Sequence, residues 1–253
     1  MDFEHVKAVF EEYLNGYDRE NDKVKLKIVH TYGVIRCSEE IGRRMGLQAE
    51  DMELAKLIAL LHDIGRFEQL KRFNSFEADT MDHATYGVQV LFEEGMIRQF
   101  IEEDTWDDVI RTAIAKHSDY ELTGITDERT LLHARLIRDA DKLDNCRVKL
   151  EDAMETLLDL SADEVGKYAI SPKVREDAFA GKCICSKDRR TPMDYWVSYV
   201  AYFYDPNFRE TLDIVAEEQY VKRIIGRVPY TNEQTKKTME ELERQLTEYV
   251  RRK

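Results

Sequence analysis

Apolar residues recur along most of the chain at spacings of three and four, and seldom alternate with polar ones. This is the period of an α-helix that turns one face towards a core. Only four prolines and eleven glycines interrupt it. The pattern predicts an all-α helical bundle, with helices over residues 2–16, 23–46, 49–63, 82–95, 105–118, 127–147, 149–160, 192–204, 216–227 and 232–252.

Local signals predict where some helices begin and end. Asp82 is expected to cap the N-terminus of its helix, and Gly46 and Gly65 are expected to end theirs. The segment 161–191 is the least regular, because it holds Ser171-Pro172, Gly181 and a charged run. We expect a catalytic core over 1–160, then a loop or lid from 161 and a C-terminal helical extension to 253, packed as one structural domain.

Composition narrows the classes of partner. The formal charge of −13 argues against nucleic acid polymers, which need a broad basic face. A small anionic substrate stays compatible, since bound dications and a few arginines reverse the potential inside a cleft. The start of the chain lacks a secretion-signal pattern, no apolar stretch reaches bilayer length, and four scattered cysteines do not make a disulfide framework. We therefore expect a cytoplasmic protein without a membrane partner, and the residues do not indicate its oligomeric state.

The pair His62-Asp63 carries the strongest chemical signal. It follows a run that is apolar nearly all round and precedes Gly65. Neighbouring residues on a continuous helix point about 100° apart, so the pair can face one site only where the helix ends. His30 and His117 lie on apolar helix faces and are expected to point inward. A single inward histidine is more often hydrogen-bonded than metal-bound, but several beside a His-Asp pair favour metal.

Further candidate ligands lie on either side of this pair in the chain. Asp141 shares a helix face with Ala134 and Ile137, whereas Asp139 and Asp144 are rotated away and are interpreted as solvated or outer carboxylates. His133 stays without a role and His5 is expected at the surface. Imidazole nitrogen and carboxylate oxygen are the ligands of Zn, Fe, Mn, Co and Ni sites. The whole set could hold two ions: His30, His62, Asp63, His83, His117 and Asp141.

The order of these ligands, with "LLHDIGR" around the pair and "RDADKLD" around Asp141, resembles the HD-domain superfamily of metal-dependent phosphohydrolases. His83 in "DHATYG" and His117 in "AKHSD" are similar to the additional histidines of its binuclear members. The resemblance covers about residues 20 to 150. It implies a first divalent ion on His30, His62, Asp63 and Asp141, and a second ion that Asp63 shares with His83 and His117. The metal would be Fe, Mn, Co, Ni, Zn or Mg.

The resemblance implies hydrolysis of a phosphate ester, in a nucleotide or similar small metabolite, by a metal-activated water. Arg66 and Lys142 are candidates for stabilising charge on the transferred phosphoryl group. Glu68 and Lys116 are candidates for proton transfer or for a contact with the leaving group. Family members often have Lys where this chain has Arg66, a change that keeps the charge and adds a planar fork for two phosphate oxygens.

Two other functions fit the same ligand order. The superfamily includes di-iron oxygenases, and the ligand atoms alone do not separate the two chemistries. A non-catalytic nucleotide sensor is the third alternative, although a complete ligand set favours an enzyme. One hydrolase branch acts on guanosine tetraphosphate and carries Glu-Asp after the His-Asp motif. Ile64-Gly65-Arg66-Phe67 stands at that place here and argues against that substrate.

Overall fold

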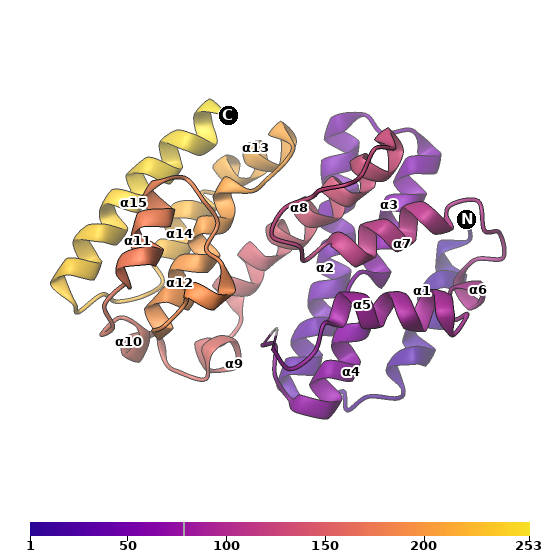
Figure 1. Cartoon of the computed structure of the whole chain (residues 1–253), viewed down its shortest axis with the longest axis horizontal. Coiled ribbons are helices and arrows are strands. Elements are labelled where there is room, and N and C mark those ends of the chain that lie inside the picture. Colours follow the sequence, from indigo (N-terminus) through magenta and orange to yellow (C-terminus); the bar gives the residue numbers. More distant parts are fainter. Residues whose placement is uncertain (78) are drawn as a thin grey trace. The chain divides into compact units, whose positions relative to one another are not determined.

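Helices make up all the regular structure that the computed structural model describes, over residues 1–77 and 79–253 (Figure 1). The expected all-α fold is confirmed. The chain forms two compact units, residues 1–144 and 145–253, which divide within the long helix α8, Glu128–Glu151. The sequence pattern placed the end of the core at residue 160. Among the described residues, none of the helices combines the length and the apolar character that crossing a bilayer requires.

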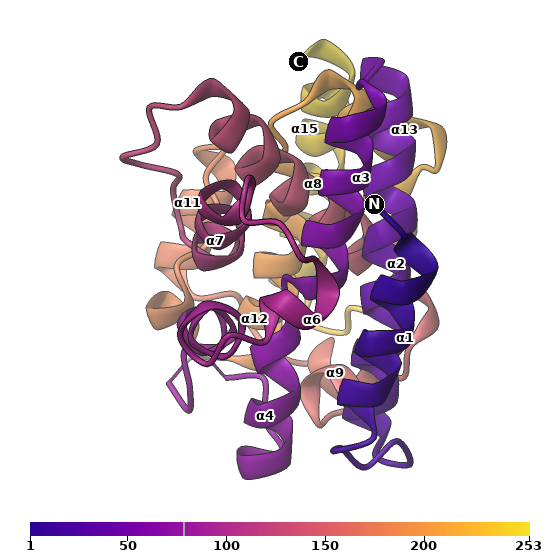
Figure 2. The ribbon, with the colours of Figure 1, turned by 90° about the vertical axis from the view of Figure 1, so that its right-hand side faces the viewer.

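The first unit is built on α2 and α3, which pack extensively against each other. Seven residues of α3 are buried, namely Leu54, Ala55, Leu57, Ile58, Ala59, Leu60 and Leu61. The run from Leu57 to Leu61 is apolar on all sides, as expected for a buried helix. Figure 2 shows α1, α2 and α3 running alongside one another. The elements of this unit before α8 are α1 (Phe3–Leu14), α2 (Asp22–Met45), α3 (Ala49–Leu61), α4 (Ile64–Phe73), α5 (His83–Val88), the short π-helix η1 (Gln89–Glu93), α6 (Ile97–Phe100) and α7 (Asp107–Lys116).

Two of the three predicted helix ends are correct. The Asp82 side chain accepts hydrogen bonds from the backbone N–H groups of Ala84 and Thr85, and Gly46 ends α2 in the left-handed region at φ 72°. The prediction for Gly65 is wrong. The chain turns at His62-Asp63, and Gly65 lies in the first turn of a new helix, α4. The sequence signal was misassigned because this glycine serves a close helix contact, described below, and not a helix end.

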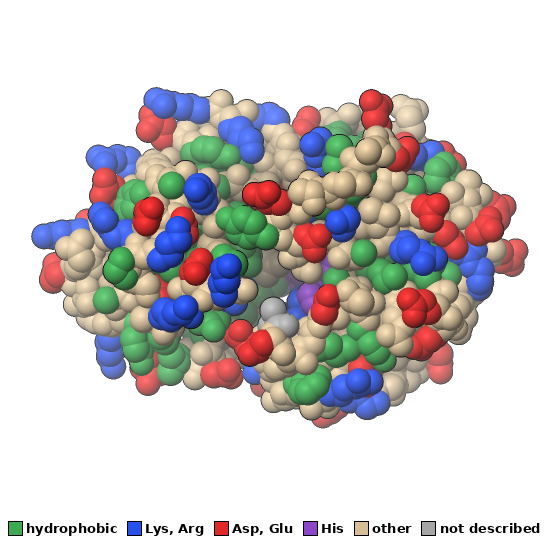
Figure 3. All heavy atoms as spheres, viewed as in Figure 1, with side chains coloured by type: hydrophobic (Ala, Val, Ile, Leu, Met, Phe, Trp, Pro, Cys, Tyr) green, Lys and Arg blue, Asp and Glu red, His purple; other side chains and the backbone are tan. Residues whose placement is uncertain are grey.

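The second unit contains α9 (Met154–Leu158), α10 (Ala162–Val165), α11 (Pro172–Phe179), a 3-10 turn (Ser186–Asp188), α12 (Pro192–Ala201), a second 3-10 turn (Tyr202–Tyr204), α13 (Arg209–Glu217), α14 (Tyr220–Ile225) and α15 (Glu233–Arg252). Acidic and basic side chains are interspersed over the visible face of each unit (Figure 3).

The expected loop or lid over 161–191 is wrong in part, because α10, α11 and a 3-10 turn lie within it. Ser161 and Glu164 form a capping box that starts α10. Pro172 occupies the first turn of α11, where its missing N–H has no cost. The Ser-Pro signal that suggested a loop therefore marks the start of a helix.

Candidate metal centre

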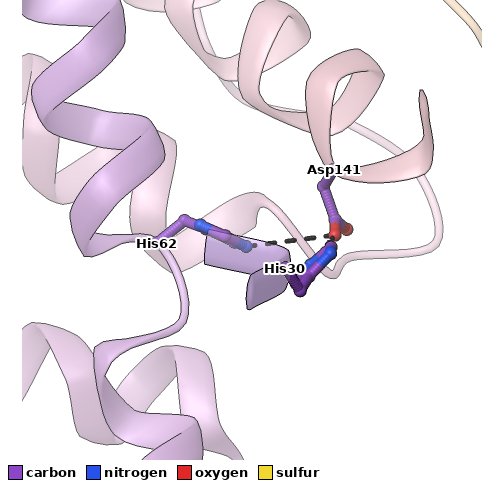
Figure 4. A group of neighbouring side chains, drawn as sticks. All are labelled: His30, His62 and Asp141. Carbon is purple, nitrogen blue, oxygen red and sulfur yellow. Dashed lines mark hydrogen bonds and ion pairs between the residues drawn. The ribbon is translucent and has the colours of Figure 1, made fainter. Parts of the chain in front are cut away.

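Six side chains from separate elements of the first unit form two groups of ligand atoms. The groups are His30, His62 and Asp141, and Asp63, His83 and His117, and within each group the atoms lie within 4.8 Å of one another. Figure 4 shows the side chains of His30 and His62 pointing towards the carboxylate of Asp141. The structure thus brings together the six candidate ligands that the sequence predicted.

The first group meets at Asp141 of α8. Its Oδ1 lies 3.0 Å from Nε2 of His30, on α2, and 3.9 Å from Nε2 of His62. His62 caps the C-terminus of α3, where its Nδ1–H donates to the carbonyl of Ala59 at 2.7 Å. That bond assigns the proton to Nδ1 and leaves a lone pair on Nε2. His62 Nε2 is buried and has no hydrogen-bond partner among the described residues.

The carboxylate of Asp63 lies between the two groups. Its Oδ2 is 3.5 Å from Nε2 of His62, whereas its Oδ1 is 3.2 Å from Nε2 of His83 and 3.5 Å from Nε2 of His117. One oxygen thus faces each group. The side chain is 3 % exposed. The carboxylate is therefore placed to serve both groups of candidate ligands.

The second group repeats the histidine geometry of the first. His117 caps the C-terminus of α7, and its Nδ1–H donates to the carbonyl of Ile114 at 2.7 Å. Its Nε2 lies 3.1 Å from Nε2 of His83, the first residue of α5. Arg138, buried on α8, donates to the carbonyls of His117 at 3.2 Å and of Asp119. Arg138 therefore fixes the end of α7 that carries His117.

Two glycines allow the helices to approach closely enough. A Cβ on Gly33 of α2 would fall 1.9 Å from Oδ1 of Asp144, the carboxylate whose Oδ2 accepts a hydrogen bond from Nδ1 of His30 at 2.8 Å. A Cβ on Gly65 of α4 would fall 2.2 Å from the carbonyl oxygen of His83. Glycine at both positions therefore lets α8 and α5 bring ligands to the site.

Burial and charge set the protonation of the ligands. Burial lowers the pKa of His62 to about 4, and burial together with Arg66 lowers the pKa of His83 to about 3. Burial acts to raise the pKa of Asp63, but Lys27 and the neighbouring histidines outweigh it and hold that pKa well below its usual range. Near neutral pH these groups are neutral imidazoles and an ionised carboxylate, the forms that bind a metal.

The hydrogen-bond pattern leaves lone pairs facing carboxylates. Since Arg66 can only donate, Nε2 of His83 accepts its bond at 2.9 Å and carries no proton. His62 and His117 hold their protons on Nδ1, and His30 uses Nδ1 for Asp144. The Nε2 lone pairs of His62 and His117 consequently face the Asp63 carboxylate, each at 3.5 Å, a repulsive arrangement unless cations lie between them. The residues fit divalent metal ions.

The family model of the HD domain matches residues 28–146, a segment that includes all six candidate ligands. This segment of the chain is therefore identified as an HD domain. This confirms the resemblance seen in the sequence, and the superfamily consists in general of metal-dependent phosphohydrolases. Searches of curated proteins and of solved structures gave no match to the chain.

The four residues predicted to have catalytic roles differ in their contacts. Arg66 contacts the second ligand group through His83. Glu68 pairs with Arg72 at 2.6 Å, and Lys116 pairs with Asp119 at 3.5 Å. Lys142 follows Asp141 on α8 and is partly buried. The catalytic roles given to these four residues stay predictions.

The structure also shows the environment of the carboxylates and histidines that the sequence did not assign as ligands. Asp144 is 2 % exposed and bonds to His30, so it is an outer carboxylate and not a solvated one; Asp139 is also buried. His133 is buried and hydrogen-bonds with Asp51 at 3.0 Å, away from the ligand groups. His5 is exposed, as expected.

Sequence reasoning missed Lys27 of α2. Its ammonium forms an ion pair with Oδ2 of Asp63 and is therefore part of the site. The available signal was its place one turn before His30, which sets both side chains on one helix face.

Proposed function

We propose that the HD domain hydrolyses a phosphate ester of a nucleotide or a similar small metabolite, with two divalent ions as cofactors. The observation that carries this proposal is the Asp63 carboxylate, whose two oxygens face separate groups of ligand atoms. Bound there, divalent ions would polarise phosphoryl oxygens and lower the pKa of a water at the site.

The ligands are pre-oriented for this task. His62 and His117 are held by backbone carbonyls, and His30 by the carboxylate of Asp144. Such outer contacts fix the ring orientation of a metal ligand and increase its basicity. The histidines therefore need little rearrangement when cations bind.

Arg66 supplies a fixed positive charge beside the second group of ligand atoms. NH1 donates to Oε1 of Gln69 at 2.5 Å, and NH2 donates to His83 at 2.9 Å. Gln69 is fully buried and its amide donates in turn to the carbonyl of Glu77 and to the hydroxyl of Thr80, each at 2.8 Å. The guanidinium is thereby positioned beside the second group, where it can stabilise the negative charge of a phosphoryl oxygen in the transition state.

The test is a phosphate-release screen on protein reconstituted separately with Mn, Co, Ni, Fe and Mg, over a panel of nucleotides and sugar phosphates. We expect turnover with at least one metal and its loss, together with metal binding, in H62A and D63A. Variant H133Q is the matched control, because His133 is a buried histidine outside the ligand groups. If the protein releases no phosphate, binds iron and consumes oxygen in a substrate-dependent way, it is an oxygenase and not a hydrolase.

A further inference from the structure

Lys27 places a cation of the chain itself inside the ligand set. Its ammonium pairs with Oδ2 of Asp63, and the two side chains are 12 % and 3 % exposed. This is the same oxygen that faces Nε2 of His62 at 3.5 Å. The ammonium therefore occupies a position on Asp63 that a metal ion shared with His62 would need.

An ammonium and a divalent ion exclude one another at that position. Two cations on one carboxylate oxygen repel each other strongly in a buried site, where the effective dielectric is low. Lys27 also lowers the pKa of Asp141, which is itself a candidate ligand. When metal ions bind Asp63 and Asp141, the Lys27 ammonium therefore loses both carboxylates as partners.

The surroundings of Lys27 show where its ammonium can go. It lies 5.9 Å from the ring centre of Phe76, and Lys23, one turn earlier on α2, lies at the same distance from that ring. Lys23 donates to the carbonyl of Asn74 at 3.1 Å and adds a like charge on this side. The lysine stem is flexible, so a short rotation keeps the ammonium beside Phe76 while freeing Asp63. The Lys27 ammonium would then be placed to pair with an oxyanion bound to the metal ions.

We propose that Lys27 is an exchangeable cation: it neutralises Asp63 in the metal-free centre, and after metal binding it contacts a phosphoryl oxygen of the substrate. The second half of this proposal rests on the proposed phosphohydrolase function. The first half rests only on the ion pair and on the ligand geometry.

The first experiment measures the affinity of the metal-free protein for Mn²⁺ by calorimetry. We expect K27M and K27Q to bind Mn²⁺ about tenfold more tightly than the wild type, the equivalent of about 1.4 kcal/mol of removed competition. Variant K25M is the matched control, since Lys25 lies on the same helix and pairs with the exposed Glu20. Its Mn²⁺ affinity should equal that of the wild type. Melting curves in chelator and in Mn²⁺ report whether each variant folds.

The second experiment adds inorganic phosphate to the Mn²⁺-bound proteins and follows the broadening of the phosphorus-31 resonance. We expect K27M and K27Q to bind phosphate about tenfold more weakly than the wild type, because they lose one charge-assisted contact. K27R should recover part of this affinity and K25M all of it. A lysine with a purely structural role would lower both affinities together.

Opposite shifts of the two affinities support the proposal. Unchanged or weaker Mn²⁺ binding by both neutral variants overturns it, and so does phosphate binding equal to that of the wild type. Opposite shifts combined with no hydrolysis of any phosphate ester would overturn the proposed function and leave the exchange by Lys27 standing. A wild-type protein that binds no divalent metal would overturn both.

Discussion

The carboxylate of Asp144 on α8 lies against Gly33 of α2, where a side chain would leave it no room. A Cβ at Gly33 would fall 1.9 Å from Asp144 Oδ1, while Oδ2 of the same carboxylate accepts the hydrogen bond from His30 at 2.8 Å. His30 lies one turn before Gly33. The missing side chain at position 33 therefore determines how the His30 ring is held towards Asp141.

Variant G33A should displace Asp144 from His30. We expect metal affinity to fall by about 10- to 100-fold, the usual cost of losing an outer partner of a metal ligand. The extra methyl group should also lower the free energy of unfolding by about 1–3 kcal/mol. Calorimetric metal titration and chemical denaturation measure the two effects. G16A is the control, because a Cβ at Gly16 lies 3.5 Å from its nearest neighbour; equal metal affinity in both variants would contradict the assigned role of Asp144.

Variant H62Q should separate a ligand histidine from a merely buried one. We expect its metal affinity to fall by more than about 100-fold, because a ligand contributes more than an outer partner does. H133Q breaks the hydrogen bond to Asp51 instead and should lose stability while keeping its metal. Metal content after dialysis, measured by mass spectrometry, distinguishes the two. Equal metal content would show that His62 is not a ligand.

The sequence predicted the helical class and all six candidate ligands, because inward histidines and a His-Asp pair at a helix end are conspicuous. It did not predict Lys27, and it left open whether Asp144 is a solvated or an outer carboxylate. A helix-face argument considers one helix at a time, whereas Asp144 reaches His30 only because α8 packs on Gly33. Gly65 was misjudged for the same reason. The sequence does not distinguish a glycine that ends a helix from one that allows a neighbouring backbone to pack closely.

Variant G65A tests that close contact. A Cβ there would meet the carbonyl oxygen of His83 at 2.2 Å and the amide nitrogen of Gly87 at 2.8 Å, both backbone atoms that cannot swing aside. We expect α5 to shift away from α4 and the free energy of unfolding to fall by about 3 kcal/mol or more. The number of bound ions per chain should also decline, because His83 moves. A G65A protein of native stability that binds as many ions as the wild type would refute this contact.

Variant R66K should affect catalysis more than metal binding. Lysine keeps the charge but cannot bond Gln69 and His83 simultaneously through a planar fork. We expect kcat/KM for a phosphate ester to fall by about 100-fold, comparable to the loss of one transition-state donor. R72K is the control, since Arg72 lies on the same helix and pairs with Glu68. Steady-state kinetics on both variants decide the point, and unchanged kinetics in R66K would remove Arg66 from the transition state.

Acid should destabilise the metal-free protein over a defined range. The pKa of His62 is lowered to about 4 and that of His83 to about 3, from an ordinary value of 6.5. Between 6.5 and those values the unfolded chain binds protons that the native chain does not. The stabilisation from keeping these histidines neutral is therefore complete above pH 6.5 and decreases as the pH falls, by about 1 kcal/mol per pH unit for each group.

Denaturant titrations in chelator at pH 7, 6 and 5 measure this slope. H62Q removes one of the two groups, so its stability should decrease less steeply with acid than that of the wild type. Adding metal should flatten the wild-type profile towards neutral pH, because an ion bound to the neutral imidazoles competes with protons for the same lone pairs. A metal-free wild type that gains stability between pH 6.5 and 5 would mean that these histidines are charged in the native protein, and a charged pair would have no lone pair to offer a metal.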